Sequence, residues 1–146
     1  MEFSPSVHYF DMLCTARKLY SQFLEPLCRS KALTRNELDV LLFLYNHPGL
    51  DRAADVSGGR GIAKSHVSQA VALLEQKQLL ERRFDPADRR TAHLALTPGG
   101  QAIAREGRDI QRSFFAAVCQ GIAPEELALW GSLLERLREN MQQMNP

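Results

Sequence analysis

The chain of 146 residues contains 45% hydrophobic and 24% charged residues, and its formal net charge is +1. This balance is typical of a folded globular protein and excludes a disordered or fibrous chain. The length allows one compact domain, or a small domain plus long helices that find their core in a second subunit, and the near-neutral charge means that any affinity for nucleic acid must come from local charge.

Neither a membrane span nor a secretory signal is indicated. The longest uninterrupted apolar runs, such as residues 40–45, are far shorter than the roughly 20 residues that cross a bilayer. The N-terminal sequence MEFSPSVHYF lacks the basic-then-apolar pattern of a signal, so we expect a cytoplasmic protein. Cys14, Cys28 and Cys119 share no CxxC spacing, which argues against a disulfide framework or a structural zinc site. We expect reduced, mostly packed thiols and neither a metal nor a cofactor.

Two helices are predicted in the first third of the chain. Ser4-Pro5 is typical of an N-cap followed by proline at the first helical position, so a long helix is expected over residues 4–29. Thr34 and Glu37 have the capping-box spacing, which predicts a second helix that ends at His47-Pro48-Gly49. The apolar residues of the first helix recur at helical spacing: Phe10, Leu13, Tyr20, Phe23, Leu24 and Leu27.

A short helix and a longer one follow. Asp51 predicts the start of a third helix that ends near Ser57, where the glycine-rich residues 58–61 interrupt the periodicity. A fourth helix is expected over residues 62–78, with one buried face. That face is formed by Val67, Val71 and Leu74. The polar residues near the N-terminus of this helix lie largely on its other side: Lys64, Ser65, His66, Ser68 and Gln69.

The apolar pattern then changes to period two. Residues 79–84 and 91–96 predict the strands of a β-hairpin with a six-residue polar tip. The apolar strand positions are Leu80, Phe84, Leu94 and Leu96. We therefore expect a fold that is mainly α with a small β-hairpin.

Two more helices are predicted after the hairpin. Thr97-Pro98 opens the first of them, which carries an apolar stripe of Ile103, Ile110, Phe114 and Val118. The last helix begins at residues 123–126, and its apolar residues step by three and four, which indicates a partner helix. These residues are Leu127, Trp130, Leu134, Leu137, Met141 and Met144.

A helix pair followed by a hairpin is typical of a winged helix-turn-helix lobe, expected here over residues 33–97. An α-helix fits the major groove of DNA, so the helix at 63–77 can present its polar residues to base edges and phosphates. The alternative is a plain solvated helix face.

The hairpin adds local positive charge. Residues 60–93 contain seven basic side chains against four acidic ones. Arg89 and Arg90 at the predicted tip can reach into a narrow minor groove, which attracts guanidinium groups. Asp88 can hold an arginine side chain in an extended pose through a charge-assisted hydrogen bond. The alternative is an ordinary solvated turn with local ion pairs.

Leu79 to Gly100, LLERRFDPADRRTAHLALTPGG, resembles the wing signature of the MarR family of bacterial transcriptional regulators, D-x-D-R-R-x-x-x-L-x-L-T-x-x-G. Residues 63–83, AKSHVSQAVALLEQKQLLERR, are similar to the family's recognition helix and first wing strand. The resemblance implies a homodimeric DNA-binding transcriptional regulator rather than an enzyme. It further implies a repressor that reads a pseudo-palindromic operator and responds to a small molecule or a redox signal.

The resemblance also implies how DNA is contacted. The recognition helix at 63–77 enters the major groove, and the wing at 80–96 enters the minor groove, where Asp88 positions Arg90. The candidate DNA-binding residues are Lys64, Ser65, His66, Ser68, Gln69, Arg82, Asp88, Arg89 and Arg90.

The helices at 4–29 and 98–146 are expected to interlock in the dimer. Candidate dimerisation residues are Phe10, Leu13, Ile110, Phe114, Leu127, Trp130, Leu134, Leu137 and Met141. An effector cavity is implied between these helices and the winged lobe, although its aromatic candidates are also ordinary core residues. These candidates are Tyr9, Phe10, Tyr20, Phe43 and Phe114. Cys14 lies on the helix that carries the reactive thiol in the peroxide-sensing branch of the family, which makes it a candidate redox residue.

Two positions depart from the family pattern. Ala63 stands where members often have a Ser or Thr cap, so the recognition helix lacks a side-chain cap of its own. Gln78 replaces a frequent Gly after that helix, and a side chain at a left-handed position carries strain, so we expect an altered turn there.

Two functions of other classes stay open. Residues 58–65 are one residue away from the P-loop pattern G-x-x-x-x-G-K-[ST], but Ala63 replaces the second Gly and the segment before it is helix-like rather than a strand. The second alternative is a winged helix that serves as a protein-interaction module without DNA binding. It predicts the same fold and no salt-sensitive binding to duplexes.

Overall fold

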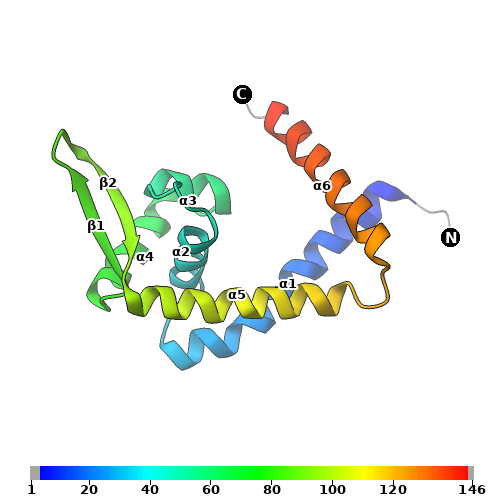
Figure 1. Cartoon of the computed structure of the whole chain (residues 1–146), viewed down its shortest axis with the longest axis horizontal. Helices are drawn as coiled ribbons and strands as arrows, with labels where there is room; N and C mark the ends of the chain where they lie inside the picture. Colours follow the sequence, from blue (N-terminus) through cyan, green and yellow to red (C-terminus); the bar gives the residue numbers. More distant parts are fainter. Residues whose placement is uncertain (1–3, 145–146) are drawn as a thin grey trace. The chain divides into compact units, whose positions relative to one another are not determined.

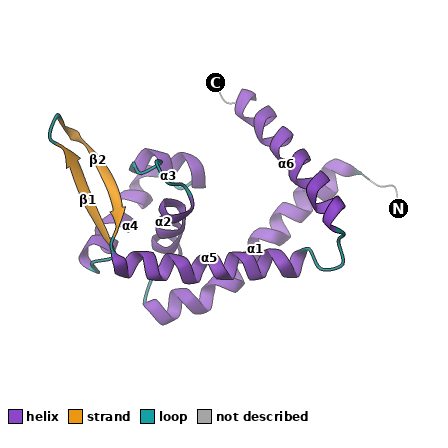
Figure 2. Cartoon of the chain, viewed as in Figure 1, coloured by secondary structure: helices purple, strands orange, loops and turns teal. Residues whose placement is uncertain are grey.

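The computed structural model describes residues 4–144. Within them the chain forms helices and one two-stranded antiparallel hairpin (Figures 1 and 2), which confirms the predicted fold class. The elements are α1 (Pro5–Lys31), α2 (Arg35–Asn46), α3 (Ala53–Arg60), α4 (Lys64–Gln76), β1 (Leu80–Asp85), β2 (Asp88–Leu96), α5 (Pro98–Val118) and α6 (Pro124–Met144). The chain divides into two compact units, and the division falls after Arg112, within α5.

The starts of α1 and α2 agree with the predictions. α2 has the expected capping box, because the Thr34 hydroxyl accepts the Glu37 N–H at 3.2 Å and the Glu37 carboxylate accepts the Thr34 N–H at 2.7 Å. α1 continues past the predicted end at residue 29 to Lys31. Ala32 then ends the helix in a left-handed conformation (φ 52°).

α3 starts later than predicted because Asp51 has another role. The N-cap is Arg52, whose N–H bonds the Asp55 carboxylate at 3.0 Å. Asp51 instead holds the hairpin, since its carbonyl accepts the Leu94 N–H at 2.7 Å and its carboxylate lies 2.8 Å from His93 Nδ1. The link between α2 and α3 is thus tied to the base of β2.

The predicted end of α3 near Ser57 is wrong, because the glycine pair continues the helix to Arg60. A Cβ built on Gly59 would lie 2.3 Å from Cε2 of Phe43, so this position needs glycine for close packing. The break comes at Gly61, which has a left-handed φ of 63°.

The hairpin is longer than predicted, and the expected six-residue tip is wrong. Its strands extend to Asp85 and from Asp88, which leaves Pro86 and Ala87 as the turn (Figure 2). The Asp85 carboxylate accepts the Ala87 N–H at 2.9 Å and so stabilises this tight turn. Phe84 was expected on the apolar side of its strand but is 54% exposed, next to a register shift between Phe84 and Asp85.

The core lies among α1, α2, α3, α4, the base of the hairpin and the start of α5. Val67, Val71 and Leu74 are buried, which confirms the predicted inner face of α4. The opposite face of α4 is therefore free of core contacts near its N-terminus. Other fully buried side chains are Leu24, Leu38, Val40, Leu41, Leu42, Val56 and Leu80.

A buried ion pair ties α2 to the end of α4. The Glu37 side chain is fully buried, and its carboxylate accepts hydrogen bonds from Lys77 Nζ at 2.7 Å and from the Thr34 N–H. Burial disfavours the charged carboxylate, but the hydrogen bonds from Lys77 and Thr34 outweigh it and hold the pKa of Glu37 below its ordinary value. Glu37 therefore remains ionised inside the lobe.

α5 begins as predicted, with the Thr97 hydroxyl accepting the Gly100 N–H at 3.1 Å. A Cβ on Gly100 would lie 2.0 Å from the Leu79 carbonyl oxygen, so glycine allows the start of α5 to approach the base of the hairpin. Ile103 is buried and Ile110 packs against the core. This part of the predicted stripe is confirmed.

The unit that begins at Ser113 has little core of its own. The rings of Phe115 and Trp130 stack with their centroids 5.8 Å apart, and Cys119 is buried. No residue of α6 is buried within its described range, 124–144. Val118, which the predicted stripe includes, is exposed.

Candidate nucleic-acid interface

The N-terminal turn of α4 is exposed and lacks a side-chain cap. Ala63 occupies the N-cap position and makes no capping hydrogen bond, as its side chain predicts. The first N–H groups of a helix have no partner within the helix, and together with the helix dipole they favour an anion. The candidate residues at this end of α4 are all exposed: Lys64, Ser65, His66, Ser68 and Gln69.

The turn after α4 keeps a left-handed residue even though glycine is absent. Gln78 has a φ of 56°, and its carbonyl accepts the Thr97 hydroxyl at 2.8 Å. The Leu79 N–H bonds the Leu74 carbonyl at 2.9 Å, which closes the helix end. The expected alteration of this turn is therefore not found, because these bonds hold Gln78 in the strained conformation.

The hairpin is joined to α4 by an ion pair. Arg82 on β1 lies 3.1 Å from the carboxylate of Glu75 on α4. Arg83, next along β1, pairs with Glu81 at 3.4 Å. Of the candidate wing residues, Arg82 thus has an acidic partner within the lobe, which orients the hairpin against the candidate recognition helix.

Arg89 and Arg90 lie on β2 rather than in a loop, and both are exposed. Within residues 4–144, neither takes part in an ion pair. Asp88 does not hold an arginine side chain as expected. Its carboxylate accepts the Arg90 backbone N–H and the Thr91 hydroxyl, each at 3.0 Å, and these bonds lower the pKa of Asp88. Asp88 thus fixes the backbone that carries Arg90.

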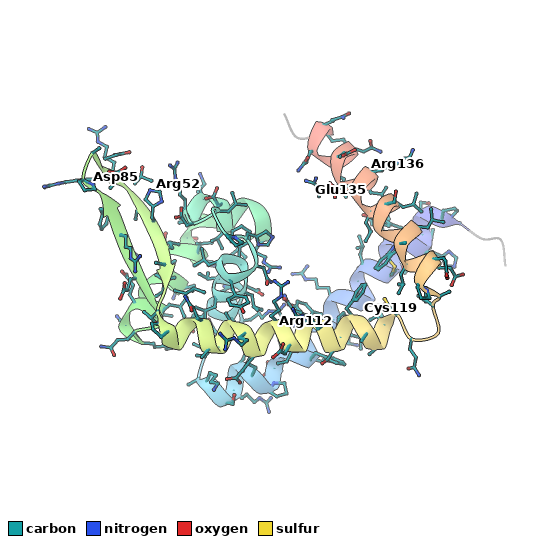
Figure 3. All side chains as sticks on the ribbon, in the orientation of Figure 1. Arg52, Asp85, Arg112, Cys119, Glu135 and Arg136 are labelled. Carbon is teal, nitrogen blue, oxygen red and sulfur yellow. The ribbon has the colours of Figure 1, made fainter. Side chains whose placement is uncertain are left out.

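Figure 3 shows Asp85 at the far end of the hairpin, with side chains projecting from both strands, and Arg52 nearby at the start of α3. Arg52 and His93 add positive potential that also lowers the pKa of Asp88. The winged lobe therefore carries an exposed, uncapped helix terminus and two exposed arginines, Arg89 and Arg90, that form no ion pair within residues 4–144.

The aromatic candidates for an effector pocket have different environments. Phe43 is buried in the core, which agrees with the alternative that it is an ordinary core residue. Tyr20 packs against the core below the Arg35 guanidinium, and Tyr9 and Phe10 pack edge to face with centroids 5.3 Å apart. Phe114 is half-buried in the unit that follows Arg112.

A basic cavity of about 570 Å³ lies in the N-terminal unit and was not predicted from the sequence. Its walls include Arg17 of α1, Arg35 of α2, Arg60 at the end of α3 and His66 of α4. The signal was weak, since these residues come from four separate segments. The i, i+4 pair of Arg35 and Asp39 was the one local pattern that pointed there.

The candidate dimerisation residues and the thiols can be placed on their helices. Cys14 is exposed, whereas Cys28 and Cys119 are buried, as expected for mostly packed thiols. Burial raises the pKa of the Cys28 thiol. Trp130, Leu127, Ile110 and Phe114 are half-buried in the isolated chain. The other candidates are exposed: Phe10, Leu13, Leu134, Leu137 and Met141.

The P-loop alternative lacks its structural context. Gly58 to Arg60 form the last turn of α3, and Lys64 begins α4, whereas a P-loop connects a strand to a helix.

No described helix is long and apolar enough to cross a membrane.

Residues 33–91 match the family model described as "MarR family". An uncharacterised HTH-type transcriptional regulator of Bacillus subtilis, YsmB, is 27% identical over 88 residues, which are 60% of this chain and 60% of YsmB. A putative transcriptional regulatory protein for the hcr operon of Thauera aromatica is 31% identical over 94 residues, 64% of this chain and 56% of that protein. The chain thus spans less than two thirds of these relatives.

Solved structures extend the similarity of fold along the chain. A MarR-family transcriptional regulator from Silicibacter pomeroyi has a TM-score of 0.78 at 22% identity, covering 88% of this chain and 86% of that one. BpsR of Bordetella bronchiseptica has a TM-score of 0.69 at 24% identity, covering 90% and 98%. The predicted resemblance to the MarR family is therefore confirmed. The similarity in sequence to the family model lies in residues 33–91, and the similarity in fold extends over most of the chain.

Proposed function

We propose that this chain, a winged-helix protein of MarR type, is a homodimeric transcriptional repressor that reads a pseudo-palindromic operator and is controlled by a small molecule or a redox signal. One observation carries the proposal. The exposed, uncapped N-terminus of α4 lies on the same lobe as a hairpin with two exposed arginines that lack acidic partners in the described chain.

α4 suits the major groove in size and chemistry. Its inner face is fixed by Val67, Val71 and Leu74, so insertion into a groove does not disturb the core. Its outer face offers a cation at Lys64, hydroxyl groups and the Gln69 amide, which can bond an adenine through two parallel hydrogen bonds. Gln69→Ala is therefore expected to relax the preference at one base pair by about 1–3 kcal/mol.

The hairpin supplies the minor-groove contact in this proposal. Asp88 holds the backbone of Arg90, and the pair of Arg82 with Glu75 keeps β1 against α4. The two elements can therefore meet adjacent grooves as one unit. Arg89 adds a second guanidinium for the phosphates that border the groove.

A homodimer explains the apolar surface that the isolated chain leaves exposed. Large apolar side chains are exposed on α1, α5 and α6, and large exposed apolar patches mark protein interfaces. A dimer presents two recognition helices about one helical turn of DNA apart, which matches an inverted repeat. The exposed residues on these helices include Phe10, Leu13, Phe115, Leu129, Leu134, Leu137 and Met141.

Control by a signal is supported by a relative in fold. The BpsR structure describes regulation of DNA binding by 6-hydroxynicotinic acid. A signal that changes the distance between the two recognition helices would prevent both from binding their half-sites at once. Cys14 stays a candidate for redox control because its thiol is exposed on α1.

Selection of bound duplexes from a random library, at two salt concentrations, tests this proposal, with the mass of the protein in solution measured in parallel. The expected result is an enriched inverted repeat bound by a dimer, with affinity that falls steeply as salt rises. Absence of enrichment, together with binding that does not respond to salt, would refute it and favour the protein-interaction alternative.

A further inference from the structure

We infer that the basic cavity beside the start of α4 binds a small, hydrophilic polyanion, such as a di- or tricarboxylate or a phosphorylated metabolite. The cavity has a volume of about 570 Å³, which lies within the range of small-molecule sites and exceeds what a single phosphate fills. All of its lining residues belong to the unit that ends at Arg112.

The charge of the cavity is unbalanced. Three guanidinium groups and one imidazole line it, against the single carboxylate of Asp39. Asp39 is already engaged, since it lies 3.0 Å from Nε of Arg35. Arg17 and Arg60 have no acidic partner within residues 4–144. Cations gathered without counter-charges favour the binding of an anion.

Arg35 is held in place for such a ligand. Its Nη1 donates to the Ser21 hydroxyl at 2.9 Å, and its guanidinium lies 5.0 Å from the centroid of the Tyr20 ring. With Asp39 on the other side, this side chain is fixed from α1 and α2 at once. A preorganised guanidinium loses little conformational entropy when it binds an oxyanion.

Arg60 has a buried donor without a hydrogen-bond acceptor among the described residues. Its Nε is the one buried side-chain N or O atom in the described chain that has no hydrogen-bond partner. The guanidinium lies 6.0 Å from the centroid of the Phe43 ring. Buried donors are nearly always paired in native proteins, so Arg60 is unusual in having, within residues 4–144, neither an acidic partner nor an acceptor for its Nε.

The start of α4 adds a second attraction for an anion. The cavity is lined by Ala63 and His66, which belong to the uncapped N-terminal turn. Oxygen atoms there can accept the free N–H groups of the turn and meet the positive end of the helix dipole. Apart from Ile62 and Ala63 the lining is polar or glycine, so the cavity favours a ligand rich in oxygen over an apolar aromatic one.

The anion bound in this cavity is the signal that controls DNA binding by the proposed regulator. This role of the site rests on the proposed function. It joins Arg17, on the proposed dimerisation helix α1, to the first turn of the proposed recognition helix α4. A ligand that bridges these elements fixes the winged lobe relative to α1. Its binding is therefore expected to change the affinity for an inverted repeat.

The test measures binding of citrate and of inorganic pyrophosphate to the full chain by calorimetry at constant ionic strength. Saturable binding is expected for at least one of them, with affinity at least tenfold lower in Arg17→Gln and in Arg60→Gln. Arg60→Lys keeps the charge and guards against misfolding of the Gln variant. Arg29→Gln is the matched control, because Arg29 is an exposed arginine of α1 that pairs with Glu25 outside the cavity, and it should bind like the parent.

Binding of neither probe, or binding that both variants retain, would overturn the site. If the two variants instead weaken duplex binding without any binding of the probes, the cavity holds a phosphate of the DNA backbone, which refutes the metabolite site and leaves the regulator intact. If a probe binds through Arg17 and Arg60 while no duplex is ever bound, the site stands and the proposed function fails.

Discussion

Removal of Lys77 tests how the lobe tolerates a buried carboxylate. In Lys77→Ala, the carboxylate of Glu37, which is fully buried in the parent, loses a hydrogen bond of 2.7 Å from a cation. Breaking a fully buried pair costs about 3–5 kcal/mol, but a third of the Lys77 side chain is exposed and water can partly replace it. We therefore expect a loss of about 2 kcal/mol, close to that of one hydrogen bond to a charged group.

The measurement is urea or thermal unfolding at fixed protein concentration, because dimerisation would couple stability to concentration. A loss of about 2 kcal/mol corresponds to a fall in Tm of about 4–8 °C for a chain of this size. Arg29→Ala is the control, since its ion pair with Glu25 is exposed and such pairs contribute about 0–1 kcal/mol. A loss in Lys77→Ala no larger than in this control would refute the reasoning.

The dependence on pH supplies a second check. The pKa of Glu37 is lowered in the folded protein. In the acidic range the folded state therefore binds fewer protons than the unfolded state. The stabilisation from the pair is present above the unfolded pKa of about 4.3 and is lost as pH falls through the lower, folded pKa. Lys77→Ala removes a cause of the lowered pKa, so its stability should decline less steeply than that of the parent below about pH 4.3. Equal declines would contradict this account.

Three further predictions concern packing, DNA and assembly. Gly59→Ala places a methyl group against Phe43 and should cost about 1–3 kcal/mol of unfolding free energy, whereas Gly58→Ala meets no atom within 4 Å in the same helix and should be neutral or slightly stabilising. Arg90→Ala should weaken duplex binding by about 1–3 kcal/mol and reduce the preference for A/T-rich flanks, which a binding isotherm can compare with Arg29→Ala; equal binding by both variants would contradict the minor-groove assignment. Leu134→Glu puts a charge on the exposed apolar face of α6 and should shift the mass in solution from dimer to monomer; a mass unchanged from the parent would argue against this face as the interface.

Elements set by local chemistry were predictable from the sequence. Thr34 and Glu37 define the start of α2 through bonds within four residues, and Thr97 does the same for α5. The periodicity of Val67, Val71 and Leu74 was sufficient to identify the inner face of α4. The exposure of its polar face follows from that periodicity as well.

Errors arose where distant segments decide the outcome. The glycines of α3 indicated a break in the helix. Gly59 instead lies within the helix, where its missing side chain makes room for the ring of Phe43, sixteen residues earlier in the chain. The cavity escaped notice because Arg17, Arg35 and Arg60 meet only once α1, α2 and α3 have packed. The spacing of residues in the sequence does not predict contacts between elements that are distant along the chain.

The hairpin is anchored at its base and free at its turn. Asp51 holds β2 near Leu94, Arg82 holds β1 to Glu75, and the turn at Pro86 and Ala87 depends only on residues next to it. Each residue added to a strand lengthens it by about 3.3 Å. The wing can therefore be lengthened, shortened or labelled at its turn without disturbing the core, which makes it an adjustable probe for the depth of a DNA groove.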